Sequence, residues 1–317
     1  MRFAIYGYGN LGRGVENAIN EDDEIQLVGI FTRRNPEQVI STYGAPVYSV
    51  NALERFANEI DVMINCGGSK SDLPHTTPKL ASRFNVVDSF DTHTDVSAHF
   101  AAVDEAARRA NKLALISAGW DPGLFSIARM YGAAVLRNAE ICTLWGPGVS
   151  QGHSEAVRGV PGVRYAASYT VSKPDAETKF FADPRSDHSA EETHRRVVYV
   201  VADENADRKE IEKGIVTMPA YYLGYDTEVH FVEKEEFLRE YTGFPHAGKV
   251  LCASDETGDR AEFRLTLPSN PAFTGRVLTV FAKAVCRLSS EGRVGAITPL
   301  EIPPSALLGR EETLKYI

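Results

Sequence analysis

The sequence predicts an α/β fold with two domains: a doubly wound parallel sheet at the N-terminus, and a second α+β domain built on a mixed or antiparallel sheet. Two observations carry this prediction. Up to about residue 120, six short apolar runs alternate with helical patterns, as in an open parallel sheet. From about 140 to 267, strand-like runs dominate. We therefore expect domains at 1–120 and 121–270, with 271–317 packing back on the first domain or on a partner chain.

The composition excludes several classes of protein. The 317 residues are 43% hydrophobic and 24% charged, with a net charge of −9 and a pI of about 5.5, which disfavours a nucleic-acid partner. The four cysteines are far apart and form no C-x-x-C pair, so we expect no metal site, no disulfide framework and a reducing cytoplasm. A strand that starts at residue 2 argues against a signal peptide, and no apolar run is long enough to span a membrane.

The first strand leads into a glycine motif. Arg2–Tyr6 is followed by a G-x-G-x-x-G pattern and then by a helical pattern that includes Leu11 and Val15. Strand, glycine turn and helix in this order are typical of a dinucleotide site in a Rossmann domain, where the helix N-terminus faces the pyrophosphate. The alternative is a glycine-rich turn with no ligand. The candidate cofactor residues here are Gly7, Tyr8, Gly9, Asn10, Leu11 and Gly12.

The end of the second strand indicates which dinucleotide binds. Sites for NAD usually place an acid about 20 residues beyond the glycine motif. Here Ile25–Phe31 ends in Thr32, Arg33 and Arg34, so an acid is absent and two cations are present. Because guanidinium groups suit phosphate oxygens, we predict NADP as the cofactor. The alternative is a solvated pair of loop arginines.

The remainder of the first domain continues the alternation. A fourth strand, Asp61–Asn65, runs into a small-residue turn that lies beside the glycine loop in a doubly wound sheet and leaves room for ribose and pyrophosphate. We therefore add Cys66, Gly67, Gly68 and Ser69 to the cofactor candidates. The other predicted elements are strands at Val47–Val50, Asn85–Asp88 and Leu113–Ser117, and helices at Ala52–Asn58, Thr77–Phe84 and Val96–Asn111.

Two aspartates follow the fifth and sixth strands. Asp91 ends the run that begins at Asp88, and Asp121 precedes Pro122. Asp121 with Pro122 resembles an N-cap and first helical residue, for a helix over Leu124–Asn138, so Asp121 could be only a cap. Both aspartates nevertheless lie at the carboxyl edge of the sheet. Two carboxylates there could handle an amino group and an attacking water.

The second domain begins with a strand at Ile141–Trp145 and an unusual glycine-rich polar loop, 146–154. The apolar helix Phe273–Leu288 is a candidate dimer element, with core burial an equal alternative. The other predicted elements are strands at Val163–Val171, Arg195–Ala202, Thr227–Val232, Val250–Ala253 and Glu262–Leu267, and a helix at Arg208–Met218.

Taken in order, these motifs resemble the meso-diaminopimelate D-dehydrogenase family along essentially the whole chain. The most specific is Trp145–Gly148 followed by Ser150–Ser154. The others are Gly7–Gly12, Thr32–Arg34, Cys66–Ser69, Asp88–Asp91, Gly119–Gly123, Pro245-His246 and Asn270-Pro271. The resemblance implies a bacterial, cytoplasmic homodimer. Its expected reaction is reversible NADP-dependent oxidative deamination of the D-centre of meso-2,6-diaminopimelate. The products are ammonia and L-2-amino-6-oxopimelate, which cyclises to tetrahydrodipicolinate, and the reverse reaction supplies diaminopimelate for lysine and peptidoglycan.

The resemblance also implies roles for single residues. Asp91 and Asp121 would be catalytic and bind the substrate amino group, with the choice between them open. The far, L-configured end of the substrate maps onto Thr170, Arg196 and His246, whose alternatives are a strand former, a solvated charge and a turn residue. Further substrate candidates are Trp120 and Trp145 as apolar walls, with Gln151, Gly152 and Asn270. Further cofactor candidates are Asp88, Ser89, Phe90, Ala118, Gly119, Trp120, Asp121 and Pro122.

Two other functions are compatible with part of the pattern. Another NADP-dependent oxidoreductase, such as a dihydrodipicolinate-reductase-like enzyme, would share the glycine loop and the arginine pair. A non-catalytic nucleotide-sensing protein would keep the cofactor loops but would need neither Asp91 nor Asp121. The stretch from Trp145 to Ser154, together with Arg196 and His246, favours the family named above.

Overall fold

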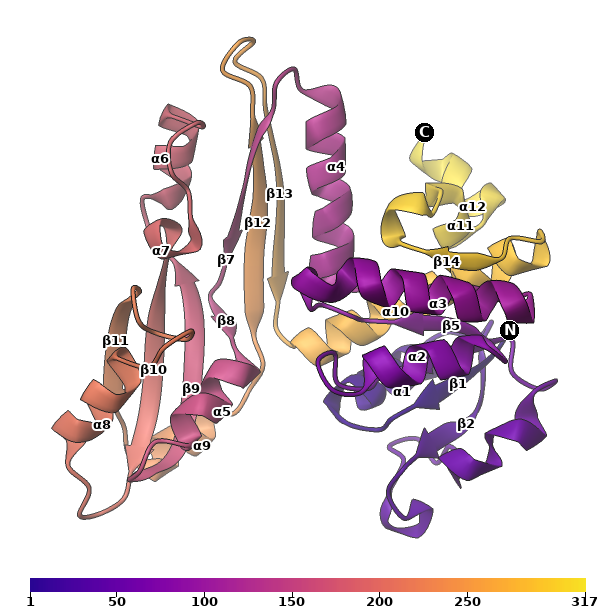
Figure 1. Ribbon diagram of the computed structural model, residues 1–317, viewed down its shortest axis with the longest axis horizontal. Helices are drawn as coiled ribbons and strands as arrows, with labels where there is room; N and C mark the ends of the chain where they lie inside the picture. The colour runs from indigo at the N-terminus through magenta and orange to yellow at the C-terminus, as the bar shows by residue number, and fades with distance from the viewer. The chain divides into compact units, whose positions relative to one another are not determined.

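The computed structural model describes all residues, 1–317, and the chain divides into two compact units (Figure 1). The first unit comprises Met1–Ile127 together with Pro271–Ile317, and the second comprises Ala128–Asn270. The chain leaves the first unit within helix α4, Phe125–Val135. The second unit is therefore an insertion between two parts of the first.

The first unit is built on a seven-stranded sheet in the order β14-β6-β5-β4-β1-β2-β3, with every pair parallel. The doubly wound sheet is confirmed, but the sequence predicted only six strands. The seventh, β14, has three residues and comes from the C-terminal segment. The strands are β1 Arg2–Tyr6, β2 Gln26–Thr32, β3 Val47–Ser49, β4 Val62–Asn65, β5 Asn85–Asp88, β6 Leu113–Leu115 and β14 Gly295–Ile297.

Helices cover both faces of this sheet, as the alternation along β1 shows. Ile5 packs in a core with Val15 of α1 and Phe281 of α10, while Ala4 packs in a second core with Val103 of α3. The helices of the unit are α1 Asn10–Asn20, α2 Leu73–Ala81, α3 Val96–Ala110, α10 Asn270–Ser290, α11 Pro304–Leu308 and α12 Arg310–Thr313. Nine residues of α10 are buried. The apolar residues of this helix therefore form core, which was one of the two alternatives.

Helices α1 and α10 approach each other at two glycines. A Cβ on Gly14 would lie 2.1 Å from the carbonyl oxygen of Pro271, and one on Gly275 would lie 2.3 Å from the carbonyl carbon of Gly14. No side chain fits at either position, because real Cβ atoms do not come so close to backbone. The returning C-terminal segment is thus packed directly against the helix that follows the glycine motif.

Two predicted helices of the first unit were wrong in detail. The residues predicted as helix Ala52–Asn58 form a 3₁₀ turn, Val50–Phe56, which packs Phe56 against the rings of Phe31 and Tyr48. The helix predicted at Thr77–Phe84 is α2, which starts four residues earlier and carries Pro78 inside it.

The second unit contains two sheets. A four-stranded sheet has the order β11-β10-β9-β8, in which β10 and β11 are parallel and the other pairs antiparallel. A three-stranded antiparallel sheet has the order β13-β12-β7. The predicted mixed or antiparallel strands are therefore present, divided between two sheets. They are β7 Glu140–Trp145, β8 Gly148–Val149, β9 Val163–Ser172, β10 His194–Ala202, β11 Asp226–Phe231, β12 His246–Ala253 and β13 Arg260–Leu267.

Several short helices of the second unit escaped the sequence analysis. The polar loop after Trp145 contains β8 and helix α5, whose N-cap is Ser150. Val157 of α5 packs against Val198, Ile211 and Tyr222 in one core of this unit. The unpredicted helices are α5 Gln151–Arg158, α6 Ala176–Ala182, α7 Ala190–Thr193 and α9 Lys234–Glu240, whereas α8, Arg208–Val216, matches the helix predicted at Arg208–Met218.

Three chemical features of the chain follow from the structure. None of its helices combines the length and apolarity required to cross a membrane. All four cysteines are free thiols. No group of three or more His, Cys, Asp or Glu side chains is arranged to hold a metal ion.

Candidate active site

The glycine motif forms a cradle at the start of α1. Gly7 has a φ of +89°, and a Cβ on Gly12 would lie 2.4 Å from the carbonyl oxygen of Gly7, so both positions require glycine. Gly9 immediately precedes α1, is exposed, and has no atom within 4 Å of an added Cβ. Open space beside the N-terminus of a helix suits a pyrophosphate. These residues therefore fit a dinucleotide.

Tyr8 enters this cradle through its backbone only. Its side chain is 3% exposed and donates its hydroxyl hydrogen to Glu16, which is also buried. Glu16 accepts further hydrogen bonds from Ser41 and from the backbone N–H of Thr42 at 3.0 Å. Burial alone would raise the pKa of Glu16, but these hydrogen bonds outweigh burial and lower the pKa. The sequence analysis missed Glu16, which lies on the buried face of α1.

The residues at the end of β2 have two different roles: some shape the turn, and one is exposed to a ligand. Thr32 is 3% exposed, and its hydroxyl accepts a hydrogen bond from the Arg34 N–H at 3.1 Å, so its side chain shapes the turn. The Arg34 guanidinium donates to the carbonyl of Tyr8 and links this turn to the glycine loop. Arg33 is 62% exposed and pairs with Asp72 at 2.8 Å. Arg33 is therefore the cation that a ligand reaches most easily.

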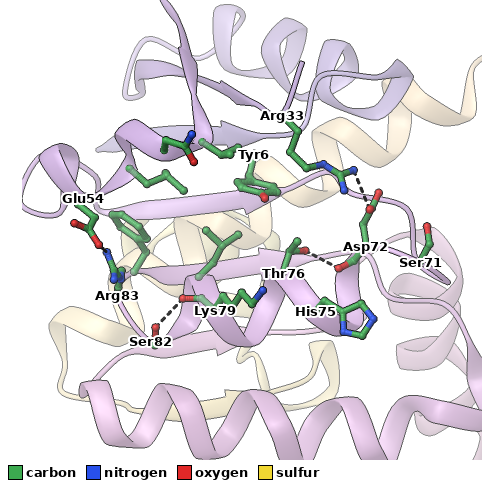
Figure 2. Close-up of a pocket in the computed structure, with 15 residues that line it drawn as sticks. Tyr6, Arg33, Glu54, Ser71, Asp72, His75, Thr76, Lys79, Ser82 and Arg83 are labelled. Atoms are coloured by element: carbon green, nitrogen blue, oxygen red, sulfur yellow. Dashed lines mark hydrogen bonds and ion pairs between the residues drawn. The ribbon is translucent and has the colours of Figure 1, made fainter. Parts of the chain in front are cut away.

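A cavity of about 850 Å³ opens beside Arg33 (Figure 2). Tyr6 and Asp72 line it, as does Lys79 further along α2. At its far end Arg83 pairs with Glu54 at 2.6 Å. Arg33 is the only predicted site residue that lines this cavity, so the cavity adjoins the cofactor candidates at β2 and not the two aspartates.

The small-residue turn after β4 lies against the glycine loop, as predicted. A Cβ on Gly7 would be 3.4 Å from the carbonyl of Cys66. Gly68 donates its N–H to Asp72 at 3.0 Å, and the hydroxyl of Ser69 accepts the N–H of Asp91 at 2.8 Å. Burial raises the pKa of the Cys66 thiol, so this cysteine stays protonated. The turn connects the glycine loop to the loop that carries Asp91.

The candidate residues at the end of β5 and in the loop after it differ in exposure. Asp91 is exposed. Asp88 and Phe90 are 0% and 1% exposed, so neither side chain is available to a ligand, and the assignment of these residues to the cofactor stays a prediction for their backbone. The alternation of a strand end explains this, since successive side chains point to opposite faces.

Asp121 is not a helix cap. It has extended backbone angles of −153° and 108°, and Pro122 is likewise non-helical, with helix α4 beginning only at Phe125. The predicted N-cap and first-turn proline are therefore wrong. Trp120 packs edge-on against Phe125, with ring centroids 5.2 Å apart, and is partly exposed. Gly119 and Ala118 are buried at the end of the sheet.

In the second unit, Arg196 and Thr170 lie opposite each other on adjacent antiparallel strands. The Arg196 guanidinium donates to the Thr170 hydroxyl and lies 4.1 Å from the ring centroid of Tyr225. Arg196 is only 9% exposed, forms no ion pair with a carboxylate, and has a buried Nε without a hydrogen-bond partner. Buried arginines are almost always paired. Its neighbour Arg195 is partly exposed and pairs with Glu228.

Neutral histidines surround this arginine. Burial, followed by the charge of Arg196, lowers the pKa of His153 to about 4. Burial also lowers the pKa of His194 to about 4, with a smaller contribution from Arg196. The backbone N–H of Trp145 donates to Nε2 of His194 at 2.8 Å, so His194 holds the backbone of a predicted substrate residue. His194 and Tyr225 were not predicted as site residues, because no sequence motif includes them, and His153 entered only as part of the motif Ser150–Ser154.

The remaining candidates of the second unit differ in exposure. His246 is half-buried at the start of β12, where its ring lies 3.0 Å from the place of a Cβ on Gly148, and burial lowers its pKa. Gln151 and Gly152 are exposed at the first turn of α5. Asn270 begins α10 and donates its N–H to the carbonyl of Phe244 at 2.9 Å.

Comparison with known proteins assigns the chain that carries these candidate residues to one family. The model of the diaminopimelic acid dehydrogenase C-terminal domain matches residues 119–269. The meso-diaminopimelate D-dehydrogenase of Lysinibacillus sphaericus is 47% identical over 307 residues, covering 96% of this chain and 94% of the relative. This chain belongs to the meso-diaminopimelate D-dehydrogenase family. The family that the motifs indicated is thereby confirmed, against both alternative functions.

Two solved structures related to this family agree with the fold. The diaminopimelate dehydrogenase of Corynebacterium glutamicum, in complex with diaminopimelate, is 42% identical with a TM-score of 0.90, over 100% of this chain and 98% of that one. An engineered D-amino acid dehydrogenase bound to NADP⁺ is 41% identical with a TM-score of 0.85, over 100% and 98% of the two chains. The NADP⁺ in that structure agrees with the cofactor predicted from Thr32, Arg33 and Arg34.

Proposed function

We propose that this chain catalyses the reversible, NADP-dependent oxidative deamination of the D-centre of meso-2,6-diaminopimelate. The products are L-2-amino-6-oxopimelate, which cyclises to tetrahydrodipicolinate, and ammonia. The observation that carries the proposal is the buried Arg196 guanidinium, which has Thr170 beside it and no carboxylate partner. A carboxylate of the substrate supplies the missing anion through a charge-assisted hydrogen bond.

The first unit provides the cofactor site. The backbone of Gly7–Gly12 and the N-terminus of α1 bind the pyrophosphate, and Arg33 binds the 2′-phosphate. NADP⁺ bound by these residues would supply the hydride acceptor for the D-carbon. The turn Cys66–Ser69 leaves room for the ribose and pyrophosphate, because its side chains are small.

Asp91 and Asp121 act at the D-centre. The amine must be neutral before hydride leaves, and water must then lose a proton to attack the resulting imine carbon, which releases ammonia. One carboxylate holds the amino group and the other accepts the proton of the water, and we leave the choice between them open. Trp120 covers the apolar part of the substrate.

The second unit recognises the far end. Arg196 and Thr170 bind the distal carboxylate, and His246, neutral because burial lowers its pKa, adds a hydrogen bond without adding charge. Trp145, held by His194, forms an apolar wall. Gln151, Gly152 and Asn270 border the substrate.

The direct test follows NADPH formation. Purified protein should reduce NADP⁺ with meso-diaminopimelate and much more slowly with the LL isomer, which has no D-centre. No reduction with the meso isomer would refute the proposed activity. We also propose a cytoplasmic homodimer, which is the family expectation. Light scattering of the purified chain should give about twice the monomer mass of 34.8 kDa.

Replacing Arg33 by alanine should raise the KM for NADP⁺ by about 10- to 100-fold, because a charged hydrogen bond contributes about 1.5–3 kcal/mol. The KM for NAD⁺ should change little. Initial rates at varied cofactor concentration measure both values. Arg83→Ala is the matched control, since Arg83 lines the same cavity and is also paired with an acid, Glu54, but lies at the end away from Arg33. An unchanged KM for NADP⁺ in Arg33→Ala would exclude the assignment of this arginine to the 2′-phosphate.

Stability should fall as the pH is lowered from about 6.5 to about 4. His194 has a pKa of about 4 in the folded chain and an ordinary value of about 6.5 when unfolded. In this window the unfolded chain binds the extra proton, so acidification favours unfolding, and the stabilisation is complete above the unfolded value. Urea unfolding at pH 7.5 and 5.0 measures the effect. In His194→Gln the pH dependence should become shallower, whereas the exposed His93→Gln should keep it; equal slopes in all three would contradict the prediction.

A further inference from the structure

A buried polar cluster lies beneath the two loops that carry Asp91 and Asp121. It is centred on Asp88, at the end of β5, and on His99, from α3. We propose that Asp88 and His99 are positioning residues, which fix the backbone of both loops and thereby the separation of the two aspartates. The inference rests on the proposed function for the role of those aspartates, but its geometry lies wholly within the first unit.

The Asp88 carboxylate uses both oxygens on separate parts of the chain. Oδ1 accepts the N–H of Phe90 at 3.1 Å and the N–H of Ser117 at 3.0 Å. The first bond fixes the turn that leads to Asp91, and the second fixes the turn that leads to Trp120 and Asp121. The backbone carbonyl of Asp88 also accepts the N–H of Ala118 at 2.9 Å. One residue therefore holds the beginnings of both loops.

The other carboxylate oxygen anchors Asp88 to two helices. Oδ2 lies 2.7 Å from Nε2 of His99 in α3 and accepts the hydroxyl of Thr77 in α2 at 2.7 Å. The His99 side chain is 2% exposed, and its ring stacks on Phe90 with centroids 4.2 Å apart. Thr77 in turn accepts a hydrogen bond from Asn65 at 3.1 Å. The cluster thus connects the two loops to the rigid body of the first unit.

The backbone at Ser117 shows why such an anchor is needed. Ser117 has a φ of +58°, in the left-handed region, which costs a residue other than glycine about 1–3 kcal/mol. Its buried hydroxyl has no hydrogen-bond partner, so the side chain does not compensate. The N–H of Ser117 on Asp88 is the contact that holds this conformation. Strained backbone of this kind persists only when its surroundings determine it.

A contribution to fold stability alone does not explain why this cluster is polar. A fully buried carboxylate is costly unless donors surround it, and replacing such a polar cluster by apolar groups is often neutral for stability. The Nδ1 of His99 is itself buried without a partner, which no stability argument explains. A role in setting loop geometry accounts for a polar cluster at this position, because small displacements of reacting groups lower rates greatly.

The test compares His99→Leu, which loses the donor to Asp88, with His99→Gln, whose side-chain amide retains one. In His99→Leu we expect kcat with meso-diaminopimelate to fall about 20-fold or more, and in His99→Gln to stay within about 3-fold of the parent, since misplacement acts on the chemical step. The dissociation constant for NADPH, from fluorescence, should change by less than about 3-fold. Thr279→Val is the control, because Thr279 is equally buried and bonds only to Gly275 of its own helix.

Amide hydrogen exchange provides a readout independent of turnover. In His99→Leu, peptides covering 88–92 and 116–121 should exchange about 10-fold faster, while peptides of α10 should be unchanged. Unaltered exchange and unaltered kcat in a folded His99→Leu would overturn the inference. If His99→Leu does not fold, His99→Phe keeps the ring on Phe90 and is measured in the same way; failure of both to fold would equally overturn it, since the cluster would then be a requirement of the fold. An inactive parent would refute the proposed function and leave the exchange result standing as the test of loop positioning.

Discussion

Arg196→Met should lower kcat/KM for meso-diaminopimelate by about 30- to 5,000-fold, the range expected when one member of a buried charge pair, worth about 2–5 kcal/mol, is removed. The guanidinium is 9% exposed and forms no ion pair with any carboxylate of the chain. The substrate carboxylate would be its anion, so the loss should fall on substrate binding. The KM for NADP⁺ should stay within about 3-fold of the parent value. Steady-state kinetics with each substrate varied in turn measures both quantities.

Arg195→Met is the matched control for this variant. It removes the same group one residue away, but Arg195 pairs with Glu228 and faces the opposite side of the strand. Its kcat/KM should stay within about 3-fold of the parent, since partly exposed ion pairs contribute little. D-alanine, which lacks a distal carboxylate, should be affected by Arg196→Met far less than diaminopimelate. Equal losses on both substrates would disprove the assignment of Arg196 to the distal carboxylate.

Arg196→Met should not destabilise the fold, because no acidic partner is left behind. Burying a guanidinium without an anion costs free energy, so an apolar replacement of similar length should leave the free energy of unfolding unchanged or increase it. Urea unfolding of the two methionine variants measures this. A stabilised but inactive Arg196→Met is the pattern expected of a binding group that the fold tolerates at a cost.

Replacing Asp91 or Asp121 by asparagine should reduce kcat by about 10²- to 10⁴-fold, the usual contribution of a positioned acid or base. Neither aspartate is the N-cap of a helix, and Asp91 is exposed, so the isosteric amide should fold normally. The two variants separate the roles that the structure leaves open. The residue that binds the amino group should show a raised KM as well as a lower kcat, whereas the residue that activates water should show mainly a lower kcat.

Two measurements control this comparison. Binding of NADPH to both variants should match the parent within about 3-fold, because the glycine loop and Arg33 are untouched. Asp95→Asn removes an exposed carboxylate from the same region and should keep full activity. Full activity in both Asp91→Asn and Asp121→Asn would mean that neither carboxylate takes part in proton transfer.

Much of the first unit could be predicted because its pattern is local. The strand Arg2–Tyr6, the glycine motif and the buried face of α1 follow each other within twenty residues, so the pattern of each element can be recognised beside the next. Strand β14 could not be predicted, because three residues carry no periodicity and only pairing with β6, far away in sequence, defines them. The same holds for Gly14 and Gly275, whose need for glycine arises from contact between two distant helices.

Site residues could be predicted from the sequence only where a reactive or charged side chain lies within a recognisable motif. Arg33 and Asp91 lie next to strand ends, where ligands of such sheets are expected. Arg196 was indicated by family resemblance, but its burial and its missing partner appear only when β9 and β10 pair. Asp88 was assigned to the cofactor by family resemblance, and only the fold shows that its side chain is fully buried. The sequence shows that a residue lies at the edge of the sheet. The direction in which its side chain points is known only from the folded structure.

The insertion of the second unit has a consequence for synthesis on the ribosome. Helix α10 and strand β14, which complete the core and the sheet of the first unit, emerge only after all of Ala128–Asn270 has been made. The second unit is one continuous stretch, so it can finish folding while the earlier half of the first unit still waits for its last strand. During that interval the apolar face of α1 that later meets α10 is open to solvent or to chaperones. The part of the chain that is translated first is therefore the last to reach its final structure.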